Sequence, residues 1–136
     1  MKKIKVLVGW SGDNYDAVAY GVDIDGCVIA TNKSLEKLEE EFKETLEFHV
    51  EGIVAGGDPV PPALRGEYEL EFELTTQALL RSIEDKITLT AIHKATGINV
   101  KQLSHYTTGE KNPRPVQRER IVNGIHSIAR ELAAVV

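Results

Sequence analysis

The stretch TGINVKQLSHYTTGEKNPRP, residues 96–115, decides how the C-terminal part of the chain folds. Gly97 and Gly109 bracket eleven residues whose pattern is helical, and a Pro-x-Pro motif beyond the second glycine prevents the helix from continuing. Asn99 is a preferred residue for a helix N-cap. The sequence therefore predicts a short polar helix over residues 99–108, with a sharp start and a sharp stop.

Two more helices are predicted before this one. The first is capped by Thr75 or Thr76 and ends near residue 85, and the second is capped by Thr88 and ends near residue 95. Gly97 then forms the turn between two short helices. Such a pair is the unit that places its second helix in the major groove of DNA, although the same pattern also occurs as a polar surface helix of an ordinary helical bundle.

The outward face of the predicted 99–108 helix carries side chains suited to reading base pairs. With Leu103 and Tyr106 facing inward, four residues face outward: Val100, Lys101, Gln102 and His105. The lysine can donate to guanine, the glutamine can pair with adenine through both ends of its amide, and the valine can touch a thymine methyl group. The histidine can donate to a base or to a phosphate. Phosphate contacts, which position a protein without reading sequence, are expected from three residues at the helix ends: Asn99, Lys111 and Arg114.

Charge is divided unevenly along the 136 residues. Residues 1–85 contain 8 Lys or Arg and 18 Asp or Glu, a balance of −10, whereas residues 86–136 contain 8 and 3, a balance of +5. A basic module attracts a polyanion, whereas an acidic module repels nucleic acid and can attract a basic protein. We therefore expect two modules with different partners.

The N-terminal half contains short strand patterns and one long helix. A turn over residues 11–14 and a second turn over residues 23–26 separate the strands, and the helix is capped by Ser34 and stopped by a Gly-Gly pair. The predicted elements are strands over 3–10, 15–22, 27–31 and 67–74 and a helix over 35–55. The chain is therefore predicted to be α+β, with a β-β-β-α-β domain over residues 1–74 and an all-helical domain over residues 75–136.

The strand EYELEFEL, residues 67–74, alternates strictly between apolar and acidic side chains. This pattern predicts one buried face and one wet face. The buried face is expected to consist of Tyr68, Leu70, Phe72 and Leu74. The four glutamates of the wet face are either simply solvated, which also discourages pairing at a sheet edge, or they form an acidic surface that binds a partner.

Enzymatic and membrane functions are disfavoured. A two-metal nuclease centre needs carboxylates that converge, whereas aspartates in turns and glutamates on a helix face are more often structural; the carboxylates concerned are Asp13, Asp16, Asp23, Asp25, Glu47 and Glu51. Cys27 is the only cysteine, which excludes a disulfide framework. No apolar run approaches the ~18 residues of a membrane span. We expect a cytoplasmic protein with no catalytic residue, metal, cofactor or membrane contact.

The last predicted helix, residues 116–136, carries an apolar seam with heptad spacing. The seam consists of Ile121, Ile125, Ile128, Leu132 and Val135. It either closes the core of its own domain or forms a contact between two copies of the chain. Gly124 is unfavourable inside a helix, so it marks a place where another helix approaches closely.

The segment ITLTAIHKATGINVKQLSHYTTGEKNP, residues 87–113, resembles the helix-turn-helix of phage-repressor (Cro-like, XRE) regulators. The matching features are the Ile-Thr start, the Gly-Ile turn, the inward Leu-Ser pair and the closing Gly-x-Lys-x-Pro. One position departs from the pattern. His93 stands four residues before the turn glycine, where these regulators usually have alanine because the two helices cross closely there.

Taken over about residues 3–135, the chain resembles the HicB family of antitoxins. NYDAVAYGVDIDGCVIATNKSLEKLEEEF, residues 14–42, is similar to the strands and acidic helix of that family. LSHYTTGEKNPRPVQRERIVNGIHSIARELAAV, residues 103–135, is similar to the tail of its Bacteroidetes-type members. The resemblance implies a partly degraded RNase H-like N-terminal domain that binds and blocks HicA, a small basic toxin that cleaves mRNA. It also implies a C-terminal domain that binds the operator of its own operon.

The expected function is therefore that of an antitoxin and autorepressor whose partners are operator DNA and a HicA-like toxin. A homodimer or a higher homo-oligomer is expected, because two-fold pairing places two such helices on a palindromic site. The alternative is a stand-alone transcription regulator whose N-terminal domain senses a ligand or only dimerises. An active nuclease is a third, weaker interpretation.

Overall fold

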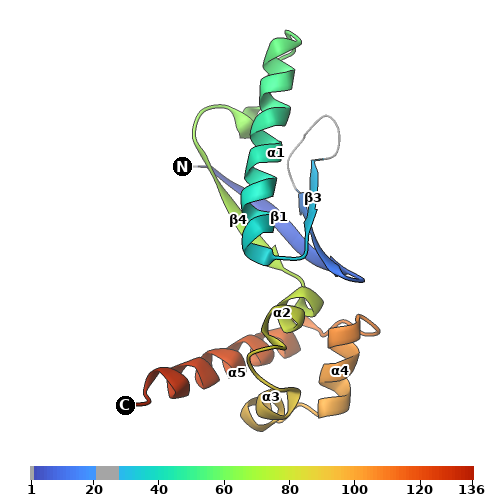
Figure 1. Cartoon of the computed structure of the whole chain (residues 1–136), viewed down its shortest axis with the longest axis vertical. Helices are drawn as coiled ribbons and strands as arrows, with labels where there is room; N and C mark the ends of the chain where they lie inside the picture. Colours follow the sequence, from blue (N-terminus) through green and yellow to red (C-terminus); the bar gives the residue numbers. More distant parts are fainter. Residues whose placement is uncertain (1, 21–27) are drawn as a thin grey trace. The chain divides into compact units, whose positions relative to one another are not determined.

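The computed structural model describes residues 2–20 and 28–136, and the chain divides into two compact units, Met1–Thr75 and Thr76–Val136. Described residues of the first unit form a four-stranded sheet and one long helix, and the second unit is helical (Figure 1). In chain order the elements are β1 (Lys2–Ser11), β2 (Asn14–Ala19), β3 (Ile29–Asn32), α1 (Leu35–Ala55), the 3₁₀ turn η1 (Pro62–Leu64), β4 (Tyr68–Leu74), α2 (Thr76–Ile83), α3 (Leu89–Thr96), α4 (Val100–Thr108) and α5 (Pro115–Ala133). The predicted α+β class is confirmed.

The predicted and observed elements differ at a few ends. α5 begins at Pro115 rather than one residue later, because proline fits the first position of a helix, where no backbone donor is needed. β2 ends at Ala19, before the predicted end of that strand at residue 22. The predicted turn over residues 23–26 lies outside the described residues, as do the predicted strand ends at residues 21–22 and 27.

The sheet has the strand order β3-β2-β1-β4, so β3 and β4 are its two edges. β1 and β2 form an antiparallel hairpin in which Ser11 pairs with Asn14. Gly12 in the turn has φ of +68°, a conformation that costs glycine nothing. β4 pairs with β1 in parallel, with Leu74 opposite Val8. A parallel partner needs a long crossover connection, and the segment that includes α1 supplies it.

One face of the sheet is covered by α1 (Figure 1). Ser34 caps the helix by accepting a hydrogen bond from the Lys37 amide. Leu38, Phe42 and Leu46 follow one another at intervals of four residues and are fully buried. The sheet and the residue before β3 contribute a matching set of buried residues: Ile4, Val6, Val8, Tyr15, Ala17, Val28 and Ala30. Leu38, Phe42 and Leu46 are the apolar stripe by which α1 packs on the sheet.

The opposite face of the sheet is open over its described strands and combines apolar and charged side chains. Leu7 is 38% exposed and Ile29 is 52% exposed, and both belong to one row across the sheet because each is in register with the same residue of β2. Tyr20 donates a hydrogen bond to Glu73 at 2.7 Å. That hydrogen bond is the largest of the effects that raise the pKa of Tyr20.

The predicted buried face of β4 is only half-buried. The alternation itself is present, since apolar and acidic residues of the strand differ in exposure at every step. The difference from the prediction has a geometric cause. β4 is an edge strand, and α1 packs mainly over β2 and β3. Phe72 still reaches Phe42, with the ring centroids 6.1 Å apart in an edge-to-face arrangement, but the outer side of β4 is left without a covering element among the described residues.

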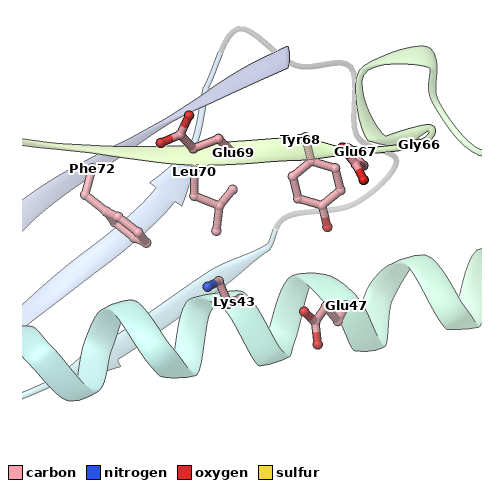
Figure 2. A pocket seen from close by; sticks show the side chains of 8 residues that line it. All are labelled: Lys43, Glu47, Gly66, Glu67, Tyr68, Glu69, Leu70 and Phe72. Atoms are coloured by element: carbon pink, nitrogen blue, oxygen red, sulfur yellow. The ribbon is translucent and has the colours of Figure 1, made fainter. Parts of the chain in front are cut away.

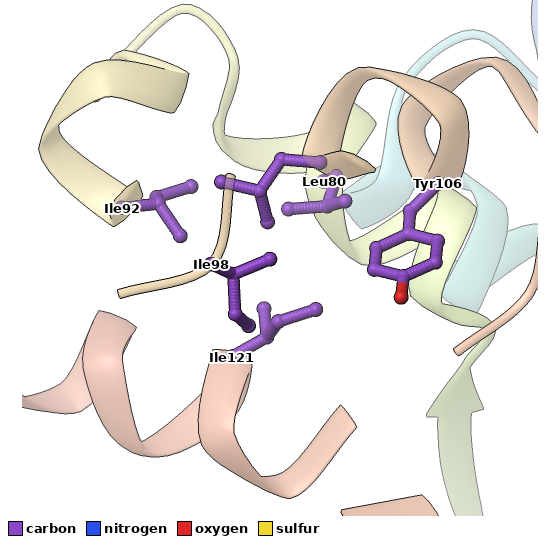
Figure 3. Packing of buried hydrophobic residues seen from close by; sticks show 6 residues of the cluster. Leu80, Ile92, Ile98, Tyr106 and Ile121 are labelled. Atoms are coloured by element: carbon purple, nitrogen blue, oxygen red, sulfur yellow. The ribbon is translucent and has the colours of Figure 1, made fainter. Parts of the chain in front are cut away.

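The second unit is built around one apolar cluster (Figure 3). Its buried members come from all four helices and the turn after α3: Leu80, Ile92, Ile98, Leu103, Tyr106 and Ile121. The inward orientation predicted for Leu103 and Tyr106 is confirmed, with exposed fractions of 0% and 4%. Burial of this kind contributes about 1.5–3 kcal/mol for each large apolar side chain, and it holds the four helices together in one compact unit.

The apolar seam of α5 divides into two parts. Ile121 is fully buried, and Ile125 and Ile128 pack partly against the same cluster, so this part closes the core of the unit. Leu132 is exposed, and α5 ends at Ala133 rather than at the predicted residue 136, so the exposed Val135 lies beyond the helix. Gly124 is buried between α5 and α3, where a Cβ would overlap the Cγ2 methyl of Thr96. The close helix approach inferred from this glycine is confirmed.

Candidate functional site

The start of α4 is fixed by the turn that precedes it. Gly97 adopts the left-handed conformation with φ of +78° and ends α3, and its amide donates to the carbonyl of His93 at 2.7 Å. Asn99 caps α4 through its Oδ1 atom, which accepts a hydrogen bond from the Lys101 amide at 2.7 Å. The amide NH₂ of Asn99 is the part of its side chain that can donate to a phosphate.

His93 does not disturb the crossing between α3 and α4. It is exposed, and its Nδ1 lies 2.8 Å from the carbonyl oxygen of Ile98, to which the protonated nitrogen donates. The side chain thus turns aside and holds the backbone of the turn. This role of His93 could not be predicted from the helix-turn-helix pattern, which has alanine at this position. The role depends on where the carbonyl of Ile98 points.

The end of α4 is held by α2. Arg81 donates from Nε to the carbonyl oxygen of Thr107 at 3.1 Å, which satisfies a helix-terminal acceptor. Gly109 has φ of +82°, and a Cβ at this position would meet the amide of Gln77 at 2.8–3.0 Å. The left-handed conformation favours glycine here, and the Gln77 side chain would have to move to admit a Cβ. α4 is therefore anchored at both ends and along its inner face.

The three residues at the N-terminal end of α4, Val100, Lys101 and Gln102, are exposed as predicted. Gln102 makes a contact that the sequence analysis missed, because its Nε2 donates to the hydroxyl of Tyr106 at 2.8 Å. An amide NH₂ has two hydrogens. One hydrogen is held by the tyrosine, and the other hydrogen and Oε1 are the groups that pair with adenine. The i, i+4 spacing of these residues was the available signal.

His105 differs from the prediction. It was expected to face outward, but it is half-buried, and its Nε2 lies 3.5 Å from a carboxylate oxygen of Glu110. The pair is an ion pair only when the histidine is protonated. A carboxylate beside the helix also repels phosphate. Glu110 follows Gly109 in the turn, and its effect on His105 was not foreseen because the turn folds back towards the helix.

A shallow hollow lies between α4 and the start of α5, with a volume of about 380 Å³. Lys111 and Arg114 line it and are exposed, as expected of phosphate contacts. Arg114 is also the N-cap residue of α5, so the backbone amides at the positive end of that helix open near the hollow. Asn112 and Gln117 line the same hollow and add donors that the sequence analysis did not single out.

Two other arginines of this unit have structural partners. Arg118 donates from Nη1 to the hydroxyl of Thr76 at 2.9 Å. Arg120 donates from Nη2 to the carbonyl oxygen of Thr96 at 2.7 Å, at the end of α3. Both tie α5 to the rest of the helical unit. The positive charge of this region therefore serves the packing of the helices as well as the exposed surface of α4.

The carboxylates considered for a nuclease centre do not converge in the described part of the chain. Among residues 2–20 and 28–136, no group of three or more His, Cys, Asp or Glu side chains is placed to hold a metal ion. Asp23 and Asp25 lie outside these residues. In the same part of the chain, every helix is too short or too polar to span a bilayer.

Comparison of the chain with protein-family models, curated protein sequences and solved structures finds no match.

Proposed function

We propose that the second unit binds operator DNA through α4, in the manner of the phage-repressor-like helix-turn-helix that residues 87–113 resemble. The observation that carries this proposal is the geometry of α4. The helix is held at both ends and along its inner face, while Lys101 and Gln102 stand exposed on its outer side. Val100 contributes an exposed apolar contact beside them.

The test of DNA binding uses the full chain and a duplex from the region upstream of its own gene. Lys101→Ala should weaken specific binding by roughly ten- to a hundredfold, because one good base contact is worth about 1–3 kcal/mol. Glu131→Ala, at the far end of α5, is the control. Affinity should also fall steeply with added salt, because phosphate contacts release counterions. Equal binding by Lys101→Ala and wild type would show that α4 does not read the bases.

We further propose that the chain is an antitoxin whose first unit binds a small basic protein of the HicA type. Residues 1–75 contain 7 Lys or Arg and 16 Asp or Glu, a balance of −9, and residues 76–136 contain 9 and 5, a balance of +4. The opposite charges suit two partners of opposite charge. The HicB resemblance, which includes a partly degraded RNase H-like fold for this unit, supports the same assignment.

The antitoxin proposal is tested with the full chain and a small basic protein encoded beside it. Binding that stops RNA cleavage by that protein is the expected result. A full chain that binds its operator but has no such partner would be a stand-alone regulator, whose first unit senses a ligand or only dimerises. Divalent-metal-dependent RNA cleavage by the chain itself would instead reveal a nuclease.

A further inference from the structure

The outer side of β4 forms a groove with α1 that the rest of the first unit leaves open (Figure 2). The groove has a volume of about 820 Å³, which is within the range of ~300–1,000 Å³ typical of ligand sites. Tyr68, Leu70 and Phe72 project from β4 towards α1, and Lys43 and Glu47 stand on the helix opposite them. Burial, followed by the charge of Glu47, raises the pKa of Tyr68.

Backbone groups of the same three residues point to the open edge of the sheet. The amide of Thr75 donates to the carbonyl oxygen of Val8 in β1 at 2.9 Å. In a strand the backbone groups of successive residues point alternately to the two sides, so every second residue before Thr75 also faces β1. The residues between them, Tyr68, Leu70 and Phe72, therefore direct their N–H and C=O groups away from β1.

We propose that this edge accepts a fifth strand from the basic partner protein, in which apolar residues alternate with lysines or arginines. This inference rests on the proposed antitoxin function, because it specifies where and how the first unit holds its partner. Side chains of an added strand point alternately to the two faces of the sheet. On the α1 side they enter the groove beside Tyr68, Leu70 and Phe72, and on the other side they lie beside Glu69, Glu71 and Glu73.

Charge selects this partner over a second copy of the same chain. Pairing of β4 with another β4 would bring glutamates of the two strands side by side on one face, and like charges in neighbouring strands are destabilising. Lys3 and Lys5 of β1 lie opposite Glu69 and Glu71 on the inner side. A basic strand on the outer side would place a second set of positive charges beside the same glutamates. The glutamates of β4 would then lie between the lysines of β1 and the basic residues of the added strand.

The test uses the full chain and a synthetic ten-residue peptide of alternating lysine and valine, blocked at both ends. The matched control is a peptide of alternating glutamate and valine. The lysine peptide is expected to bind and to slow amide exchange at Tyr68, Leu70 and Phe72, whereas the glutamate peptide does not bind. Absence of protection at these amides, or equal binding of the two peptides, overturns the proposal.

A pair of variants separates the backbone contribution from the side-chain contribution. Leu70→Pro and Leu70→Ala both remove the leucine from the groove, but only proline also removes the outward N–H, and proline is tolerated on an edge strand in this orientation. We expect Leu70→Pro to bind the lysine peptide roughly three- to tenfold more weakly than Leu70→Ala, because an added-strand hydrogen bond is lost. Equal affinities overturn the added strand, provided that unchanged circular dichroism and thermal unfolding show both variants folded.

The outcome also separates this inference from the proposed function. If a neighbouring basic protein binds the full chain and is neutralised without protecting the amides of β4, the antitoxin assignment stands and the fifth strand is wrong. If the lysine peptide binds the edge but no neighbouring toxin is neutralised, the edge is a strand-binding site and the antitoxin assignment is wrong.

Discussion

At the residue scale, the hydroxyl of Tyr106 supports the proposed recognition of DNA by α4. The ring belongs to the core of the second unit, and the hydroxyl accepts the Gln102 amide at 2.8 Å. One side chain thus joins the rigid interior to the surface that is proposed to read adenine. A glutamine held in place loses less side-chain entropy on binding than a mobile one.

Tyr106→Phe removes this hydroxyl and leaves the ring. We expect binding of a site containing the recognised adenine to weaken by roughly three- to tenfold, because about one hydrogen bond of positioning is lost. Binding to a site with that adenine replaced should change little, so the discrimination between the two sites is the quantity to measure. Thermal unfolding of the variant is the control, and equal losses on both sites would show that the hydroxyl has only a structural role.

Glu110 is expected to limit the affinity of α4 for DNA. Glu110→Gln removes a negative charge beside the helix and releases His105 to donate to a phosphate. We predict a gain in affinity of about two- to fivefold at low salt, the size expected for one exposed charge, and a smaller gain at high salt because of screening. Glu131→Gln changes the net charge equally and is the control. A gain of the same size in both variants would assign the effect to net charge alone.

Among the elements, the packing of α5 against α3 depends most on a single residue. Gly124 allows the two helices to approach until Thr96 fills the space of a missing Cβ. The hydroxyl of Thr96 is also in use, since it donates to the Ile92 carbonyl and accepts from the Ile98 amide. The methyl group alone is therefore the part of Thr96 that a larger residue at position 124 would displace.

Gly124→Ala should destabilise the second unit by about 1–2 kcal/mol, because overpacking outweighs the gain of about 1 kcal/mol in helix propensity. Thr96→Ser removes the obstructing methyl group and keeps the hydroxyl. The double variant is therefore expected to recover most of the lost stability in urea unfolding of the full chain. A stabilising effect of Gly124→Ala alone would contradict the close contact.

The limits of the helices and strands were predicted from the sequence more accurately than the burial of their side chains. Capping residues and glycines are local signals, so Asn99, Gly97 and Gly109 placed the limits of α4 correctly. The alternation of β4 is also a local signal, but burial depends on which strands α1 crosses, and that is set by tertiary packing. The half-buried position of His105 was missed because it depends on how the turn after α4 folds back. The contact between Gln102 and Tyr106 did have a local signal, the i, i+4 spacing of the two residues, which was overlooked.

At the scale of the whole molecule, the exposed end of α5 is the surface we expect to pair two copies of the chain. Leu132 continues the seam of α5 beyond the core of the unit and is 63% exposed, and Val135, which follows the end of the helix, is 77% exposed. Leu132→Asp should convert a dimer into a monomer in sedimentation equilibrium and weaken operator binding. Val54→Asp is the control, since Val54 is similarly exposed, at 60%, on α1. An unchanged molecular mass for Leu132→Asp would show that the two copies pair through another surface, and the open face of the sheet would then be the candidate.

The junction between the units bears on how the protein is degraded. β4 ends at Leu74 and α2 begins at Thr76, and the one residue between them donates its amide to Val8. Proteases cut exposed loops with small and polar residues, so the junction is protected and the exposed loop after α1, at residues 56–59, is open to attack. A cut there separates β1, β2, β3 and α1 from β4 and leaves the helices of the second unit on one fragment. For an antitoxin of the kind proposed, such a cut would divide the unit that holds the toxin and leave the unit that binds the operator on one fragment, so repression would outlast neutralisation.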